Sequence, residues 1–108
     1  MEYINRIELQ GLVGSIRSNI VNGCKVANFS LETEFIYSTS DRFPVVEVTW
    51  HNVVAWEQSA KGCDLSEIGK GSKVRVLGRL RTSKYTGANG EEKIYYEVIA
   101  SEVSIVKE

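Results

Sequence analysis

Residues 72–82 read SKVRVLGRLRT, a stretch in which two kinds of side chain alternate. Successive side chains of a β-strand point to opposite faces, so the stretch presents two distinct surfaces. One face is apolar enough to line a barrel, and its members are Val74, Val76, Gly78 and Leu80. The other face is basic, and its members are Lys73, Arg75, Leu77, Arg79 and Arg81. The alternation predicts a half-buried strand with a cationic outer surface.

The basic residues of the chain are concentrated around this strand. The formal net charge is −1, yet positions 70–84 hold six of the 13 Lys and Arg residues and no Asp or Glu. The remaining positions combine seven basic residues with all 14 acidic ones. A local run of cations suits a polyanion backbone, because each neutralised phosphate releases counterions. A solvated face that balances acids elsewhere explains the charge alone equally well.

The sequence on either side contains four more strand candidates, separated by turn residues. They cover about 3–20, 24–35, 45–56 and 93–106. Asn22-Gly23 is a two-residue hairpin signal between the first two, and 86–90 predicts a second hairpin turn. The apolar positions of the first candidate change parity near Gly11 and Gly14, which predicts a bent or bulged strand. Barrel strands need such bends.

Residues 57–68 are the one helix candidate, and Gly69 could end that helix. Five strands with one short helix between the third and the fourth is the element order of an OB-fold. We therefore expect an all-β protein, a five-stranded Greek-key barrel that occupies residues 1–108 as a single domain. Because a fold does not fix a function, the function has to be argued from the side chains that face outward.

The third strand candidate places two tryptophans on one face. Trp50 and Trp56 lie six residues apart and therefore share a parity. One interpretation puts both in the barrel core, because tryptophan is costly to leave in water. The other makes them a platform on which nucleic-acid bases stack. Tyr37 before the polar loop at 38–42 and Tyr85 after the basic strand would extend such a platform.

Several functional classes lack support in the sequence. No apolar run approaches the roughly 18 residues of a membrane span, and the N-terminus lacks a signal-peptide pattern, so we expect a cytoplasmic protein without a membrane partner. Cys24 and Cys63 are expected to be reduced packing residues, and they show no metal-ligand spacing with the single histidine, His51. No nucleophile or metal-binding carboxylate cluster accompanies His51. We expect no enzyme, no metal and no cofactor.

Five segments, taken together and in order, resemble the bacterial single-stranded DNA-binding protein (SSB) family. They are 5–11 (NRIELQG), 26–31 (VANFSL), 50–54 (WHNVV), 70–82 (KGSKVRVLGRLRT) and Gly90 with Glu97-Val98. Each segment alone is a weak signal, whereas the ordered set covers nearly the whole chain. The resemblance implies sequence-nonspecific binding and protection of single-stranded DNA during replication, recombination and repair.

The resemblance also implies roles for individual residues. Aromatic residues at the positions of Trp50, Trp56 and Tyr85 stack on DNA in that family, and Tyr37 or Phe35 falls near a fourth aromatic site. The family's equivalents of Arg81 and Lys84 lie along the DNA path, and the basic strand adds Arg79 and Lys73 to the cations expected to contact phosphates. His51 matches a histidine associated with subunit assembly. The family resemblance further implies a homo-oligomer, a tetramer or a dimer, that is associated with the nucleoid.

The C-terminal end departs from the family pattern. Family members continue into a disordered tail with an acidic tip that recruits other proteins, whereas this sequence ends at 104–108 (SIVKE). Either the sequence is truncated before the tail, or it is a short variant that binds DNA without the usual tail-mediated protein partners. An alternative function is a tail-less OB-fold adaptor of the primosomal type, which acts mainly through protein partners. Binding of single-stranded RNA also stays open, because stacking and phosphate contacts serve both polymers.

Overall fold

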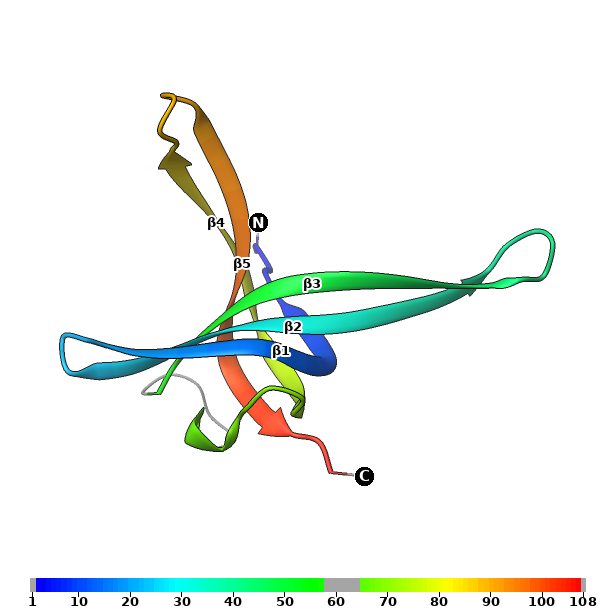
Figure 1. The fold of residues 1–108 in the computed structure, drawn as a ribbon, viewed down its shortest axis with the longest axis horizontal. Coiled ribbons are helices and arrows are strands. Elements are labelled where there is room, and N and C mark those ends of the chain that lie inside the picture. Colours follow the sequence, from blue (N-terminus) through cyan, green and yellow to red (C-terminus); the bar gives the residue numbers. More distant parts are fainter. Residues whose placement is uncertain (1, 58–64, 108) are drawn as a thin grey trace.

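The computed structural model describes residues 2–57 and 65–107, and its five long strands form a closed barrel (Figure 1). The strands are β1 (Ile7–Val21), β2 (Cys24–Ser38), β3 (Pro44–Trp56), β4 (Lys73–Thr86) and β5 (Glu92–Ile105). Their order around the barrel is β1-β2-β3-β5-β4. Every pairing is antiparallel except the short parallel contact of Val53 and Val54 with Val98 and Ile99. The prediction of an all-β, five-stranded barrel is confirmed.

Alternation along the strands builds the barrel core. Val74 and Val76 on β4 are fully buried, as are Ala27 and Leu31 on β2 and Ala55 on β3. Their neighbours in sequence point outward, which confirms the predicted two-sided pattern of these strands. Leu80 is an exception, because it is 41% exposed and does not line the barrel as we expected. Beyond Gly78, β4 pairs only with β5, so Leu80 lies at the start of a two-stranded arm.

The first strand bends as its glycines predict. β1 pairs with β4 over Ile7–Leu12 and then with β2 over Leu12–Val21. The register with β2 shifts between Val13 and Ile16, so the predicted bulge is confirmed. At Gly11, an added Cβ would lie 1.9 Å from the carbonyl oxygen of Glu32 on β2. A glycine at this position therefore lets β1 cross close to β2 where the barrel closes.

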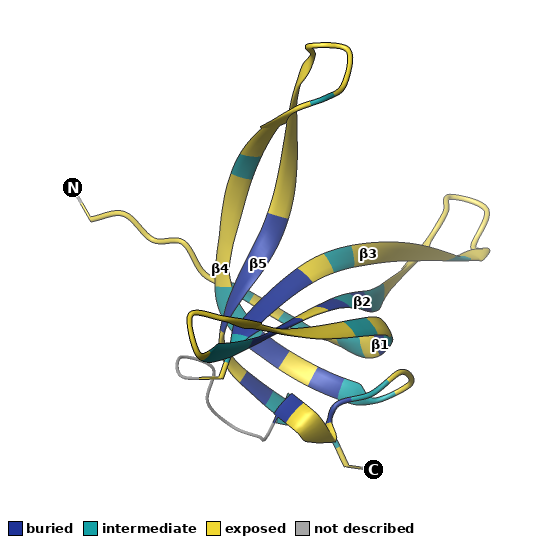
Figure 2. Cartoon of the chain, turned by 60° about the vertical axis from the view of Figure 1, so that its left-hand side comes forward, coloured by how far each residue is buried: buried dark blue, intermediate teal, exposed yellow. Residues whose placement is uncertain are grey.

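Two hairpin arms extend from the barrel, and Figure 2 shows both mostly as exposed residues. The β2–β3 ladder continues to Ser38 opposite Pro44, and the β4–β5 ladder continues to Thr86 opposite Glu92. Both ladders are longer than the sequence predicts. The β1–β2 turn contains Asn22 (φ 51°) and Gly23 (φ 80°), which confirms the predicted two-residue hairpin.

The segment predicted as a helix is described only in part. Within the described part of 57–68, one 3₁₀ turn, η1 (Leu65–Glu67), is present, and 58–64 lie outside the described residues. Leu65 and Ile68 are buried against the barrel core, so this segment covers the core beside β4. Among the helices of the described residues, none is long and apolar enough to cross a membrane.

His51 lies on the inner-facing side of β3, where burial lowers the pKa of its imidazole below 6.5. Its Nε2 is 2.8 Å from the hydroxyl Oγ1 of Thr33 on β2. The folded state therefore resists protonation of His51, whereas the imidazole of the unfolded chain takes up its proton with the ordinary pKa of 6.5. The stability that depends on neutral His51 is fully present above pH 6.5 and is lost as the pH falls below that value.

We expect His51→Gln to reduce the acid sensitivity of folding, because glutamine cannot gain this charge. Thermal unfolding of both proteins at about pH 7.5 and about pH 5.5 checks the prediction. Wild type should lose more stability between the two values than the variant does. Equal losses would show that the carboxylates alone cause the acid sensitivity.

Candidate nucleic-acid interface

The outer side of β3 carries both tryptophans. Trp50 is 57% exposed, and Trp56 is partly buried against a small cluster of Val26, Val54 and Ile99. This cluster is separate from the main barrel core, which takes the opposite face of β3 through Val53 and Ala55. The interpretation that places both tryptophans in the barrel core is therefore wrong. Trp50 is largely available to a ligand, whereas Trp56 also holds the outer cluster together.

Trp50 lies against the bulge of β1. A Cβ added at Gly14 would be 2.5 Å from Cζ3 of the indole and 2.9 Å from the hydroxyl Oγ of Ser30. The same hydroxyl accepts a hydrogen bond from the backbone N–H of Ser15 at 3.0 Å. The absent side chain at Gly14 thus gives the indole its place beside β1, and Ser30 ties β2 to the bulge. Sequence reasoning assigned Gly14 to the bend but did not connect it with Trp50.

Arg79 and Arg81 project from the outer face of the β4–β5 arm. They pair across the ladder with Ile99 and Glu97, so both lie on the face of β5 that contributes Ile99 to the Trp56 cluster. The guanidinium of Arg81 donates to Oε1 of Glu97 through Nε at 2.9 Å and also through Nη2. Arg81 remains half exposed despite this ion pair. The tryptophan face and the arginine face are therefore joined through β5.

Two tyrosines continue this face toward the end of the arm. Tyr85 and Tyr95 are 48% and 41% exposed, and their ring centroids lie 5.6 Å apart at an interplanar angle of 55°. Tyr95 belongs to β5 and was not singled out from the sequence. The period-two pattern of 93–106 could have placed it on the same face as Glu97, but only the β4–β5 register brings it to Tyr85.

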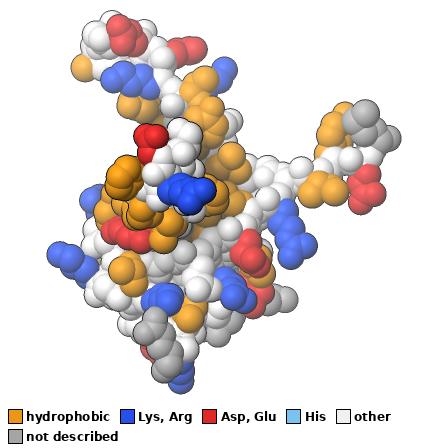
Figure 3. All heavy atoms as spheres, turned by 90° about the vertical axis from the view of Figure 1, so that its right-hand side faces the viewer, with side chains coloured by type: hydrophobic (Ala, Val, Ile, Leu, Met, Phe, Trp, Pro, Cys, Tyr) orange, Lys and Arg blue, Asp and Glu red, His pale blue; other side chains and the backbone are white. Residues whose placement is uncertain are grey.

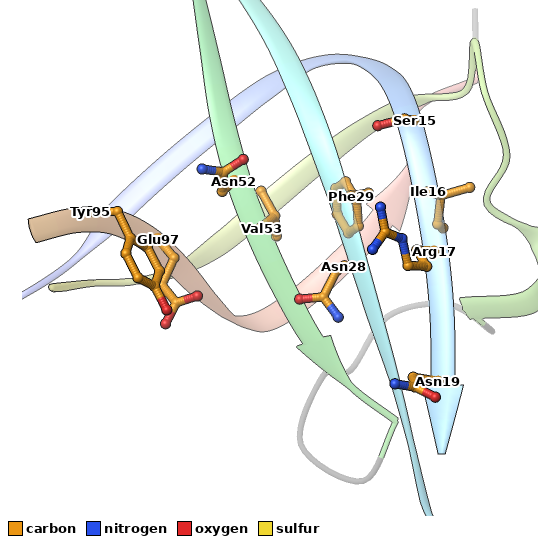
Figure 4. A pocket seen from close by; sticks show the side chains of 10 residues that line it. All are labelled: Ser15, Ile16, Arg17, Asn19, Asn28, Phe29, Asn52, Val53, Tyr95 and Glu97. Atoms are coloured by element: carbon orange, nitrogen blue, oxygen red, sulfur yellow. The ribbon is translucent and has the colours of Figure 1, made fainter. Parts of the chain in front are cut away.

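A groove of about 550 Å³ runs between the β1–β2–β3 side and β5 (Figure 4). Its polar lining includes Arg17 of β1, Asn28 of β2, Asn52 of β3, and Tyr95 and Glu97 of β5. Sequence reasoning missed all five as site residues. Arg17 and Asn28 are cross-strand partners, a relation that depends on the bulge in β1 and cannot be read from spacing alone. The groove offers amide, guanidinium and aromatic groups to one ligand.

We define the binding face as the surface that these residues share. It comprises Trp50, Trp56, Arg79, Arg81, Tyr85 and Tyr95, together with the groove residues Arg17, Asn28, Asn52 and Glu97. The face combines flat aromatic rings with cations, which are the groups that hold a single-stranded nucleic acid. In the described residues, no group of three or more His, Cys, Asp or Glu side chains could hold a metal ion.

The structure does not bring Lys84, Tyr37 and Lys73 to the binding face. Lys84 pairs with Ile94 on the opposite side of the β4–β5 arm from Arg81. Tyr37 pairs with Val45 on the opposite side of the β2–β3 ladder from Trp50. Lys73 lies at the far end of β4 and lines a separate pocket with Glu32 and Glu34.

The β2–β3 arm carries its own exposed hydrophobic side chains, and Figure 3 views the molecule with this arm toward the reader. Phe35 is 65% exposed, and its ring centroid lies 6.2 Å from that of Tyr37. Ile36 and Phe43 are exposed to 64% and 69%. Such an arm suits contact with a partner or a ligand, because monomeric proteins rarely leave large apolar patches in water.

A closed OB barrel with aromatic and arginine side chains on one outer face defines a domain of the oligonucleotide-binding type. The chain belongs to the single-strand binding protein family, whose model matches residues 4–106. It is 28% identical over 106 residues to the single-stranded DNA-binding protein of Neisseria meningitidis, with 95% of this chain and 60% of the relative covered. It is 33% identical over 102 residues to that of Rickettsia felis, with 89% and 65% covered.

Two solved structures are similar in fold. The SSB of Plasmodium falciparum in complex with ssDNA is similar with a TM-score of 0.83 and 28% identity, over 99% of this chain and 98% of that one. A deletion mutant of the single-stranded DNA-binding protein from Thermus aquaticus shares the fold with a TM-score of 0.77 and 17% identity, over 96% and 51%. The chain spans about 60% of the length of the first curated relatives that it matches.

Proposed function

We propose that this chain binds single-stranded DNA without regard to sequence and protects exposed strands during replication, recombination and repair. Bases stack on Trp50, Trp56, Tyr85 and Tyr95, while Arg79, Arg81 and Arg17 meet phosphates. The observation that carries the proposal is the exposed indole of Trp50, which shares one face with the arginines and the tyrosine pair. Membership of the single-strand binding family supports it. The binding involves no catalysis and no cofactor.

Titration with oligo-dT tests this function through tryptophan fluorescence at a low and a high salt concentration. We expect strong quenching at low salt that added salt reverses. The logarithm of the binding constant should fall against the logarithm of the salt concentration with a slope of about −0.7 for each phosphate neutralised. Duplex DNA of the same length should quench far less, because its bases are already stacked. The absence of quenching at low salt would favour the adaptor function, and equal affinity for oligo-U would extend the ligand to RNA.

We also propose that the chain assembles into a homo-oligomer, a tetramer or a dimer, in the cytoplasm. The exposed Phe35, Ile36 and Phe43 of the β2–β3 arm support assembly, because association would cover them. Light scattering coupled to size-exclusion chromatography measures the mass in solution. A protein that stays at the monomer mass at every concentration would contradict this part of the proposal.

Gly14→Ala should displace Trp50 without opening the barrel. The added Cβ would meet the ends of the Trp50 and Ser30 side chains, which can move, and it meets no backbone atom among its three nearest contacts. We expect the tryptophan emission to shift. Oligo-dT binding should weaken about threefold to tenfold, because the displaced indole loses part of the stacking free energy of one base. The matched control is Gly69→Ala, where an added Cβ would meet no atom within 4 Å. Unchanged emission and affinity would show that Gly14 does not set the indole position.

A further inference from the structure

Glu97 is an acidic residue in a face that is otherwise suited to a polyanion. It is 8% exposed and is the one buried polar or charged residue among those the structure describes. Its Oε1 accepts hydrogen bonds from Nε of Arg81 at 2.9 Å, from Nη2 of Arg81, and from the hydroxyl Oγ of Ser83 at 3.3 Å. Its side chain also lines the groove with Asn52 and Tyr95 (Figure 4). The buried carboxylate therefore neutralises part of the positive charge of Arg81, to which a phosphate would bind.

The geometry leaves Arg81 engaged on one side and open on the other. Nε and one donor of Nη2 point to Glu97, so Nη1 and the second Nη2 hydrogen are left for a ligand. The Arg81 side chain is 50% exposed, whereas that of Glu97 is 10% exposed. Water can therefore reach Arg81 but hardly screens Glu97, so Glu97 holds the guanidinium from its buried side while the other side faces solvent.

We propose that Glu97 is an internal competitor for phosphate at Arg81, which orients the guanidinium and limits the affinity of the binding face for single-stranded DNA. The inference rests on the proposed function. A phosphate that contacts Arg81 shares the cation with Glu97, so this contact contributes less affinity than the contact of a free arginine. The bound strand can consequently leave more readily than the number of cations on the face implies.

Glu97→Gln tests the competition, because glutamine keeps the size and the acceptor oxygen but removes the charge. We expect oligo-dT binding at low salt to tighten about threefold to tenfold. The log–log salt slope should steepen by up to about 0.7, the value for one full phosphate contact, because Glu97 no longer neutralises part of the Arg81 charge. The matched control is Glu102→Gln, which removes the same charge from an exposed position on β5 opposite Leu77. It should change the affinity less than about twofold.

The steeper slope should require Arg81. In an Arg81→Gln background, Glu97→Gln should leave the salt slope unchanged, because no guanidinium charge is there to be freed for the phosphate. Glu97→Asp provides a second test if the Glu97→Gln protein melts early. The shorter side chain draws the carboxylate away from Arg81. The affinity of the Glu97→Asp protein for oligo-dT should therefore lie between those of wild type and Glu97→Gln.

The outcomes separate this inference from the proposed function. Wild type that fails to bind oligo-dT at low salt would overturn the function itself. Wild type that binds, with a folded Glu97→Gln protein of equal or weaker affinity, would overturn the competition alone. A slope that steepens equally with and without Arg81 would also overturn it, because Glu97 would then act as a general charge.

Discussion

Trp50→Ala is expected to weaken oligo-dT binding about fivefold to a hundredfold and to leave the barrel folded. The indole is 57% exposed and lies outside the main core, so its removal opens no cavity among the buried residues. The loss of one base-stacking contact costs about 1–3 kcal/mol of binding free energy, which sets this range. Fluorescence anisotropy of a labelled oligonucleotide measures the affinity, and thermal unfolding measures the fold.

The matched control for Trp50 is Tyr96→Ala. Tyr96 is an aromatic side chain of similar exposure, 61%, but it pairs with Thr82 on the side of the β4–β5 arm opposite Arg81. Its removal should leave the affinity within about twofold, since it offers no stacking surface on the binding face. Trp56→Ala should weaken binding and also lower the melting temperature, because Trp56 packs against Val26, Val54 and Ile99. If the Trp50→Ala protein bound oligo-dT as tightly as wild type does, Trp50 would not be the central stacking residue.

Gly78→Ala is expected to cause a large loss of stability. An added Cβ would lie 2.1 Å from the carbonyl oxygen of Ile99 and 3.0 Å from Cα of Ala100. Both are backbone atoms of β5 that cannot swing aside, and the β4–β5 register shifts at this point. Overpacking of this kind costs about 3 kcal/mol, which corresponds to a fall of about 10 °C or more in the melting temperature.

Gly69→Ala serves as the control for Gly78→Ala, because the open space around Gly69 accepts a methyl group. Differential scanning calorimetry of the two variants beside wild type gives both melting temperatures under one condition. A Gly78→Ala protein that melts within a few degrees of wild type, while Gly69→Ala also does, would show that β5 can withdraw from β4 without cost. The close approach of β4 and β5 at Gly78 would then not be needed for the stability of the fold.

The fold was largely predictable because short sequence patterns determine its strands, turns and bulge. Alternation in 72–82 fixes the two faces of β4, Asn22-Gly23 fixes the first hairpin, and the parity change near Gly14 locates the bulge. The helix was not predictable to the same degree. Its described part contains a 3₁₀ turn, and both Leu65 of this turn and Ile68 after it pack against the barrel core.

The candidate site was predictable in part, and its main errors arose because the strands are longer than the sequence indicates. Parity placed Trp50 and Trp56 on one face but could not say whether that face was the core, because both faces of β3 carry valines. Tyr37 and Lys84 were treated as neighbours of the platform, at positions beyond the predicted strand ends. The strands continue to Ser38 and Thr86, so alternation turns both side chains to the opposite sides of their ladders.

The groove could not be predicted, because it depends on which strands meet. Arg17, Asn52 and Glu97 come from three strands, and β3 and β5 contact each other through only a short parallel ladder. The pairing of Arg81 with Glu97 requires the β4–β5 register, which shifts at Gly78. Residues of opposite charge that lie 16 positions apart give no such signal in a single sequence.

Photo-cross-linking with an oligo-dT that carries 5-iododeoxyuridine tests most directly where the strand lies on the protein. Mass spectrometry of the cross-linked peptides identifies the aromatic residues in contact with bases. We expect cross-links at Trp50, Tyr85 and Tyr95, the exposed aromatic side chains of the binding face. Cross-links confined to Tyr3 and Tyr96, with none at Trp50, would place the DNA on another surface and contradict the account.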